Sequence, residues 1–132
     1  GTSIKMATLP LDVQGLLRDL PADVPAWQEM PGNSVIGHVH LRVGNPVLAE
    51  EWWNSEFGLD TVHRLTGSAV FLSSGGYHHH IGANSWASRG AGLREEGRAG
   101  LAWVEMQSSP DRAGVERRDP WGTVIRTVPT KN

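Results

Sequence analysis

Five of the six histidines in this chain lie in two short segments. His38 and His40 are separated by one residue, and His78, His79 and His80 are consecutive. Residues two apart in a β-strand point to the same face of a sheet, so this spacing predicts imidazoles gathered on one face. Neutral imidazole is the commonest side-chain ligand of transition metals in proteins. The residue types and their spacing therefore predict a site for a divalent metal.

Alternation of apolar and polar residues predicts which side of the first segment carries its histidines. Residues 35–43 alternate in the manner of a strand, with Val39 and Leu41 on the apolar side. His38 and His40 fall on the opposite side. We expect that side to be the open face of a sheet.

The same alternation applies to the second segment. Tyr77 and Ile81 form an apolar side together with His79. We therefore expect His78 and His80 on the open face, beside the histidines of the first segment. His79 is expected to point away from them.

The donor set narrows the choice of metal. The chain has no cysteine, which excludes thiolate sites, and carboxylates are rare near the histidines. A nitrogen and oxygen site of this kind favours iron(II), manganese or zinc. One alternative stays open, because consecutive histidines also occur on solvated edges and a strand histidine is often a hydrogen-bonded core residue. His63, alone in its segment, is expected to be structural or exposed.

One helix is strongly signalled after the first histidine segment. Asn45 suits an N-cap, Pro46 the first helical position and Gly58 a C-cap. Short apolar runs separated by glycine-containing turns then predict strands over residues 61–65, 69–73 and 77–81. The predicted order is strand, helix, strand, strand, strand, which makes this an α+β protein.

The flanking regions are expected to be less regular. Leu9–Leu20 predicts an amphipathic helix that Asp12 can cap, followed by a linker with Trp27 as its apolar anchor. Later in the chain we expect a surface loop over residues 84–98 pinned by Trp86, a strand over 100–107, a turn at 119–122 and a strand over 123–128. This organisation predicts a helix and linker over 1–34, a central module over 35–86 and an incomplete second module over 87–132.

Composition excludes several classes of partner. The 132 residues suffice for one domain, and a net charge of −2 offers no basic stripe for nucleic acid. No apolar stretch approaches the roughly 20 residues of a membrane span, and no secretory signal is visible. Together with the absence of cysteine, this predicts a cytoplasmic protein without a nucleic-acid or membrane partner.

Several runs together resemble the vicinal oxygen chelate superfamily. They are Ile36–Leu41, Phe57–Leu59 and Phe71–Gly82, followed by Asn84 and Trp86. The combined pattern is similar to the catechol 2,3-dioxygenase-like branch of the group that also holds glyoxalases and bleomycin-resistance proteins. The resemblance implies a βαβββ module, with Met6–Leu17 similar to the connector before the third such unit of longer members. It implies a match to their C-terminal half alone, and hence pairing as a homodimer or with an absent N-terminal half.

Two features depart from the pattern of that branch. Between Gln107 and Val115 the second module lacks about 20–25 residues, the size of a helix and a strand. Where the superfamily often places a metal-binding glutamate, this chain has Arg126. The resemblance therefore implies a shortened second module and an incomplete facial triad.

The resemblance also implies roles for the histidines. At matching positions, His38, His40 and His80 would be metal ligands, and His78 and His80 would be acid–base groups. The implied cofactor is iron(II), with manganese(II) or zinc(II) as alternatives, and the implied substrate is a small aromatic or diol compound cleaved with dioxygen. Three other functions stay open: a glyoxalase-type lyase or isomerase, a non-catalytic protein that binds a small aromatic or antibiotic ligand, and a fragment without independent activity.

Overall fold

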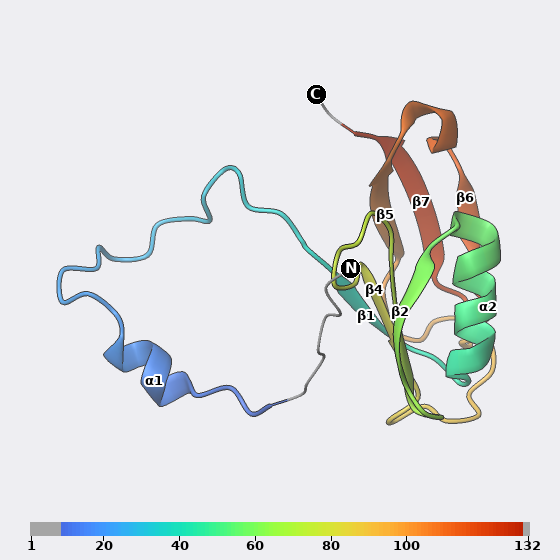
Figure 1. Cartoon of the computed structure of the whole chain (residues 1–132), viewed down its shortest axis with the longest axis horizontal. Coiled ribbons are helices and arrows are strands. Elements are labelled where there is room, and N and C mark those ends of the chain that lie inside the picture. The colour runs from blue at the N-terminus through green and yellow to red at the C-terminus, as the bar shows by residue number, and fades with distance from the viewer. Residues whose placement is uncertain (1–8, 131–132) are drawn as a thin grey trace. The chain divides into compact units, whose positions relative to one another are not determined.

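The computed structural model describes residues 9–130 of a chain that divides into two units, Gly1–Ile36 and Gly37–Asn132 (Figure 1). Among the described residues of the first unit, one short helix, α1, covers Val13–Arg18. The Asp12 side chain caps it by accepting a hydrogen bond from the Gly15 N–H at 2.8 Å, as predicted.

The first unit differs from its prediction in two respects. Helix α1 is shorter than the predicted range and has no buried residues. Trp27, expected to be an apolar anchor, is 72% exposed, so that expectation was wrong. Met6–Thr8, the start of the expected connector, lie outside the described residues.

The second unit begins with a four-stranded sheet and one helix. Strand β1 covers Val39–Arg42, helix α2 Pro46–Phe57, β2 Asp60–Leu65, β3 Ala69–Ser73 and β4 Ile81–Asn84. The strands lie in the order β1-β4-β3-β2, with β1 parallel to β4 and the other pairs antiparallel. The predicted order of elements and the α+β class are confirmed.

Local signals set the two ends of α2. The Asn45 side chain accepts a hydrogen bond from the Val47 N–H at 2.9 Å, and Pro46 opens the helix. Gly58 ends it in the left-handed conformation, with φ of 62°, which a residue without a Cβ adopts freely. All three predicted positions are confirmed.

Strand β4 starts later than predicted. Gly75 and Gly76, with φ of 63° and 76°, form a turn after β3, and residues 77–80 are not in a strand. The predicted strand over 77–81 therefore shares only Ile81 with β4. The three consecutive histidines lie in the connection that leads into the strand.

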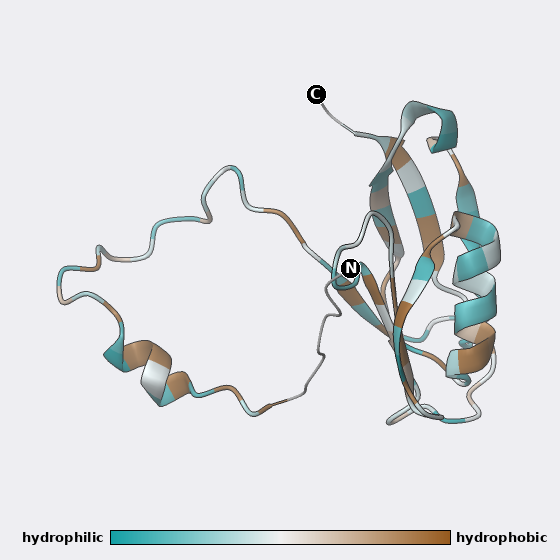
Figure 2. Cartoon of the chain, viewed as in Figure 1, coloured by the Kyte–Doolittle hydropathy of each residue, from teal (hydrophilic) through white to brown (hydrophobic). Residues whose placement is uncertain are grey.

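The core of the module lies between α2 and the sheet. Leu41, Val43, Val70 and Leu72 pack in one cluster with Trp53, and all five are at most 4% exposed. Figure 2 shows apolar segments in the strands, while α2 is largely hydrophilic beyond its N-terminal end. The side of β1 that carries the histidines is therefore the open side of the sheet.

The second sheet repeats part of the first. Strand β5 covers Trp103–Ser108, the short 3-10 helix η1 Pro110–Arg112, β6 Glu116–Arg118 and β7 Val124–Pro129. The order is β5-β7-β6, with β5 parallel to β7 and β6 antiparallel to it. This arrangement matches β1-β4-β3 and leaves out counterparts of α2 and β2. Strand β6 was not predicted from the sequence.

The loop after β4 is held by a different tryptophan from the one predicted. Trp86, expected to pin it, is 57% exposed, so that expectation was wrong. The indole N–H of the buried Trp121 instead donates to the Ala91 carbonyl at 2.9 Å. The Gly90 N–H also donates to the Gly44 carbonyl at 2.8 Å, which ties the loop to the segment after β1.

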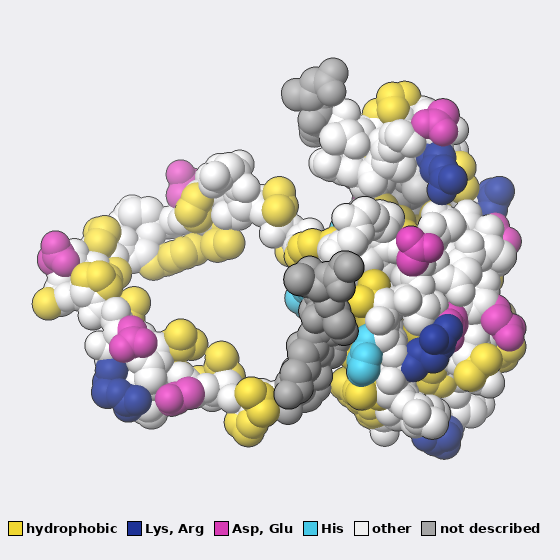
Figure 3. All heavy atoms as spheres, in the orientation of Figure 1, with side chains coloured by type: hydrophobic (Ala, Val, Ile, Leu, Met, Phe, Trp, Pro, Cys, Tyr) yellow, Lys and Arg dark blue, Asp and Glu magenta, His cyan; other side chains and the backbone are white. Residues whose placement is uncertain are grey.

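The surface in Figure 3 carries acidic and basic side chains interspersed with one another. That face shows no basic stripe of the kind that phosphate-backbone binding requires. Within residues 9–130, no helix has the length and apolar character needed to cross a membrane.

Candidate metal centre

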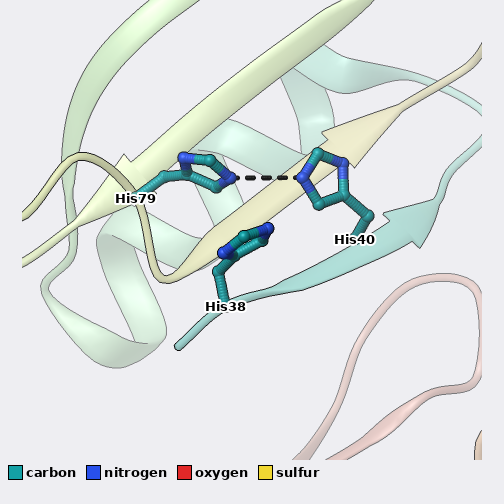
Figure 4. A group of neighbouring side chains, drawn as sticks. All are labelled: His38, His40 and His79. Carbon is teal, nitrogen blue, oxygen red and sulfur yellow. Dashed lines mark hydrogen bonds between the residues drawn. The ribbon is translucent and has the colours of Figure 1, made fainter. Parts of the chain in front are cut away.

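Three histidine side chains converge where β1 and β4 begin (Figure 4). His38, His40 and His79 each offer one ring nitrogen, and these atoms all lie within 4.8 Å of one another. The Nε2 atoms of His40 and His79 are 3.2 Å apart. His38 precedes β1, His40 belongs to it, and His79 lies in the connection before β4. Because β1 and β4 run parallel, the segments before them enter the sheet at the same end of the strands.

Backbone hydrogen bonds hold these segments in register. The Val39 N–H donates to the His80 carbonyl at 3.0 Å, and the His80 N–H donates to the Leu72 carbonyl at 2.8 Å. His40 pairs with Gly82 on the neighbouring strand. A Cβ at Gly82 would lie 2.8 Å from two atoms of the His40 ring. The absence of a side chain at Gly82 therefore leaves the space that this ring occupies.

The structure places His79 in the cluster, although the sequence predicted it on the apolar side. Strand alternation begins only at Ile81, where β4 starts, and the connection before it does not alternate. The His79 side chain is 7% exposed, and both of its ring nitrogens face other imidazoles. The prediction for His79 was wrong because it extended the alternation of a strand into a turn.

His78 and His80 lie beside the cluster in different ways. Nδ1 of His78 is 2.7 Å from Nδ1 of His79. Nδ1 of His80 is 3.0 Å from the Ser73 hydroxyl and accepts a hydrogen bond from the Ser74 N–H at 3.3 Å. A backbone N–H only donates, so this contact favours the His80 tautomer with its proton on Nε2. The role of His80 as a metal ligand stays a prediction, and the geometry favours His79 in that place.

The environment of the cluster favours neutral imidazoles. Burial, followed by the nearby histidines with His38 first, lowers the pKa of His79 from 6.5 to about 4. Burial also lowers the pKa values of His40 and His80. The charge of nearby His38 lowers the pKa of His40 further, and that of His78 lowers the pKa of His80 further. A metal binds imidazole in its neutral form. At neutral pH, His79 is therefore uncharged, and one of its ring nitrogens has a lone pair for a metal.

Two aromatic rings support the histidines. The Phe71 ring lies 5.1 Å from that of His79 and is 6% exposed, so it closes one side of the cluster to water. The Tyr77 ring lies 4.2 Å from that of His78 at an interplanar angle of 38°. The sequence reasoning missed Phe71, although its position between two core-facing residues of β3 is the signal that it faces the open side.

The donor set fits a transition metal. Zinc–nitrogen bonds are about 2.0–2.1 Å long, so two nitrogens on a tetrahedral ion lie about 3.3 Å apart. The Nε2 atoms of His40 and His79 are separated by 3.2 Å. Within the described part of the chain, the only group with metal-ligand spacing consists of three histidines without a carboxylate. Imidazole ligands suit zinc, copper, iron and nickel.

Arg126, where the resemblance implies a glutamate, is engaged within the second sheet. Its Nε lies 2.7 Å from the Glu116 carboxylate, and its guanidinium lies 4.8 Å from the centre of the Trp103 ring. A guanidinium carries its charge permanently and has no lone pair to offer a metal. Arg126 therefore cannot supply the metal ligand that the resemblance implies at this position.

The chain is similar to a curated protein of known name. Over 102 residues, which are 76% of this chain, it is 39% identical to the catechol-2,3-dioxygenase of Bacillus subtilis (strain 168). It spans 35% of the length of that protein. No family model matches the chain.

Two solved structures share its fold. One is a protein from the mobile metagenome of V. Pseudocholerae, with a TM-score of 0.51 and 18% identity, covering 75% of this chain and 96% of that one. The other is the lactoylglutathione lyase of Agrobacterium tumefaciens, with a TM-score of 0.50 and 17% identity, covering 74% of this chain and 94% of that one. At these identities the likeness is one of fold alone. Together with the 39% identity to the dioxygenase, this shared fold supports the resemblance to the vicinal oxygen chelate superfamily.

Proposed function

We propose that the chain is a metal-dependent, extradiol dioxygenase-like module that acts on a small aromatic diol. The observation that carries this proposal is the convergence of His38, His40 and His79, whose ring nitrogens lie within 4.8 Å of one another. The similarity to a protein named catechol-2,3-dioxygenase supports the class of reaction.

In this proposal the three histidines hold the ion through neutral ring nitrogens. Iron(II) is the proposed metal, with manganese(II) or zinc(II) as alternatives. When bound, such a metal supplies Lewis-acid activation of the diol beside dioxygen. Phe71 keeps water from the side of the cluster that it covers, which strengthens electrostatic interactions there.

His80 is the proposed acid–base residue, because the Ser73 hydroxyl beside its Nδ1 can either donate or accept a hydrogen bond. The Ser73 hydroxyl is 3.0 Å from Nδ1 and 3.2 Å from the Ser74 carbonyl, to which it can donate. To act as a base, His80 moves its proton from Nε2 to Nδ1, where the Ser73 hydroxyl can accept the hydrogen bond and the 3.3 Å contact with the Ser74 N–H is given up. Nε2 of His80 is then free to take a proton from a diol oxygen. With the proton on Nε2 instead, the same ring donates a hydrogen bond to the substrate.

Metal content and catechol turnover test the proposal. The protein is reconstituted with iron(II) under anaerobic conditions, and oxygen uptake is then followed with catechol. We expect His38→Ala, His40→Ala and His79→Ala to lose both metal and turnover. His63→Ala is the matched control, because this half-buried histidine lies outside the cluster and should keep both. A wild-type protein that binds no divalent metal would contradict the proposal.

A non-catalytic binding protein of the same fold is the second candidate. Arg126 favours it, because β7 (Val124–Pro129) contains no carboxylate residue that could complete the metal site. A thermal shift induced by catechol that survives chelation, without oxygen uptake, would select this function. A glyoxalase-type lyase would instead act without consuming dioxygen.

We also propose that the module pairs with a second copy of itself. Strands β1, β2, β5 and β6 are the end strands of the two sheets, and proteins usually cover such edges. Leu101 and Trp103 near the edge strand β5 are 48% and 51% exposed. Light scattering should therefore give twice the mass of one chain, and the mass of a single chain would contradict pairing.

The cytoplasmic location stays a prediction.

A further inference from the structure

We propose that His78 is a positioning residue, which holds His79 in the tautomer that leaves Nε2 free for a metal. The inference rests on the proposed function, because it concerns a ligand of the proposed metal site. It assigns His78 a role other than the acid–base role implied by the resemblance. The observation that carries it is the 2.7 Å separation between the Nδ1 atoms of His78 and His79.

The positions of the protons follow from the two contacts of His79. A neutral imidazole carries one proton, on either Nδ1 or Nε2, and a hydrogen bond between two imidazoles needs one donor and one acceptor. Nε2 of His79 faces Nε2 of His40 at 3.2 Å, and an ion shared by these atoms requires a lone pair on both. The His79 proton then sits on Nδ1 and is donated to Nδ1 of His78. His78 in turn carries its own proton on Nε2.

The surroundings of His78 hold its ring in place for this contact. The half-buried His78 ring lies 4.2 Å from the Tyr77 ring and 5.5 Å from the His38 ring. The Tyr77 hydroxyl lies against the backbone of Gly37, where a Cβ would be only 2.9 Å from it. Because its neighbours already hold the His78 ring, the ring loses little further rotational freedom when it accepts the hydrogen bond from His79.

His80 does not compete for this role. Its Nδ1 is already engaged by Ser73 and by the Ser74 N–H. No carboxylate belongs to the group with metal-ligand spacing in the described part of the chain. His78 therefore takes the place that a carboxylate or carbonyl commonly occupies behind a metal-binding histidine.

Such a partner fixes the orientation of the ligand and raises its basicity. Removing one typically weakens metal affinity by about 10–100-fold. We expect a loss of this size when the acceptor at residue 78 is removed while the ring stacking is kept. An acceptor restored at the same place should recover most of the affinity.

Two substitutions at residue 78 separate hydrogen bonding from packing. His78→Phe keeps an aromatic ring beside Tyr77 but has no acceptor. His78→Asn loses the ring but places an amide oxygen near the former Nδ1. His63→Phe is the matched control, because it makes the same exchange at a histidine outside the cluster. Thermal unfolding of each variant checks that it folds.

The first measurement is cobalt(II) affinity, by calorimetry at neutral pH. We expect His78→Phe to bind cobalt about 10–100-fold more weakly than the wild type, and His78→Asn and His63→Phe to stay near it. Equal affinities for the wild type and a folded His78→Phe would overturn the inference. They would leave the proposed metal site intact.

The second measurement needs no metal. Ring nitrogen shifts of His79, from NMR on 15N-labelled protein, report which nitrogen carries the proton. We expect the proton on Nδ1 in the wild type and in His78→Asn, and a mixture of tautomers in His78→Phe. A metal-free wild type with the His79 proton on Nε2 would overturn the inference. Failure of the wild type to bind cobalt would instead count against the proposed function.

Discussion

Gly82 of β4 lies directly beside His40 of β1, and the His40 ring occupies the space that a side chain at Gly82 would fill. A Cβ there would come within 2.8 Å of Cε1 and Nδ1 of the ring. Van der Waals contacts do not allow that distance, so either the ring or the strand has to move. The arrangement of the histidine cluster thus depends on Gly82, which has no side chain to offer a metal.

Gly82→Ala is therefore expected to weaken metal binding. The added methyl group displaces the His40 ring from the cluster, and we expect a loss of affinity on the order of tenfold. Calorimetric titration with zinc(II) or cobalt(II) measures it. Gly92→Ala is the control, because a Cβ there meets no atom within 4 Å. Unchanged metal affinity in a folded Gly82→Ala protein would show that the His40 ring can bind the metal without the space beside Gly82.

Gly44→Ala is expected to destabilise the whole second unit. A Cβ at this position would lie 1.9 Å from the Ala91 carbonyl oxygen and 2.8 Å from Nε1 of Trp121. It would break the contact by which Trp121 holds the loop after β4. Overpacking of this kind costs about 1–3 kcal/mol, and a backbone atom cannot give way as a flexible side chain does. Urea unfolding, again with Gly92→Ala as control, should show the loss, and equal midpoints would refute it.

Asp119 is expected to stabilise the turn before β7. Its buried carboxylate accepts hydrogen bonds from the Trp121 N–H at 3.0 Å and the Thr123 N–H at 2.7 Å. Asp119→Ala leaves both donors unpaired, which costs about 1–3 kcal/mol of unfolding free energy. Asp119→Asn keeps an acceptor and should lose less. Chemical denaturation of both variants measures the difference, and an alanine variant as stable as the wild type would contradict the assigned role.

The lowered pKa of His79 predicts a pH dependence of stability. The side chain titrates at its ordinary value of 6.5 in the unfolded chain and at about 4 in the folded protein. Between these values the unfolded chain binds the proton more readily. The contribution of His79 to stability is therefore complete above pH 6.5 and is lost progressively as the pH falls toward 4. Urea unfolding of the metal-free protein over this range measures the slope.

His79→Gln is the control for that slope. Glutamine does not titrate, so the variant should depend less steeply on pH than the wild type over the same range. His40 and His80 have pKa values lowered by burial and contribute slopes of the same sign. Identical slopes for the wild type and His79→Gln would mean that His79 is not held neutral by the fold.

Local sequence determined α2 and the side of β1 that carries histidines. Asn45, Pro46 and Gly58 act on the backbone within a few residues of their own positions, so their effect needs no tertiary contact. The alternation of Val39 and Leu41 was equally informative, because one face of the strand is buried against α2. For these elements the prediction and the structure agree.

Tertiary structure decided which of the consecutive histidines join the cluster. Hydrogen bonds from the Val39 N–H to the His80 carbonyl and from the His80 N–H to the Leu72 carbonyl set the register in which β4 starts. That start leaves His79 in the connection, outside the alternation of the strand. Val39 belongs to β1, which is separated from residue 80 by α2, β2 and β3, so no local pattern around residues 77–80 reveals this pairing. The sequence by itself therefore determined that imidazoles gather on the open face, and the pairing of β4 with β1 and β3 decided that His79 is among them.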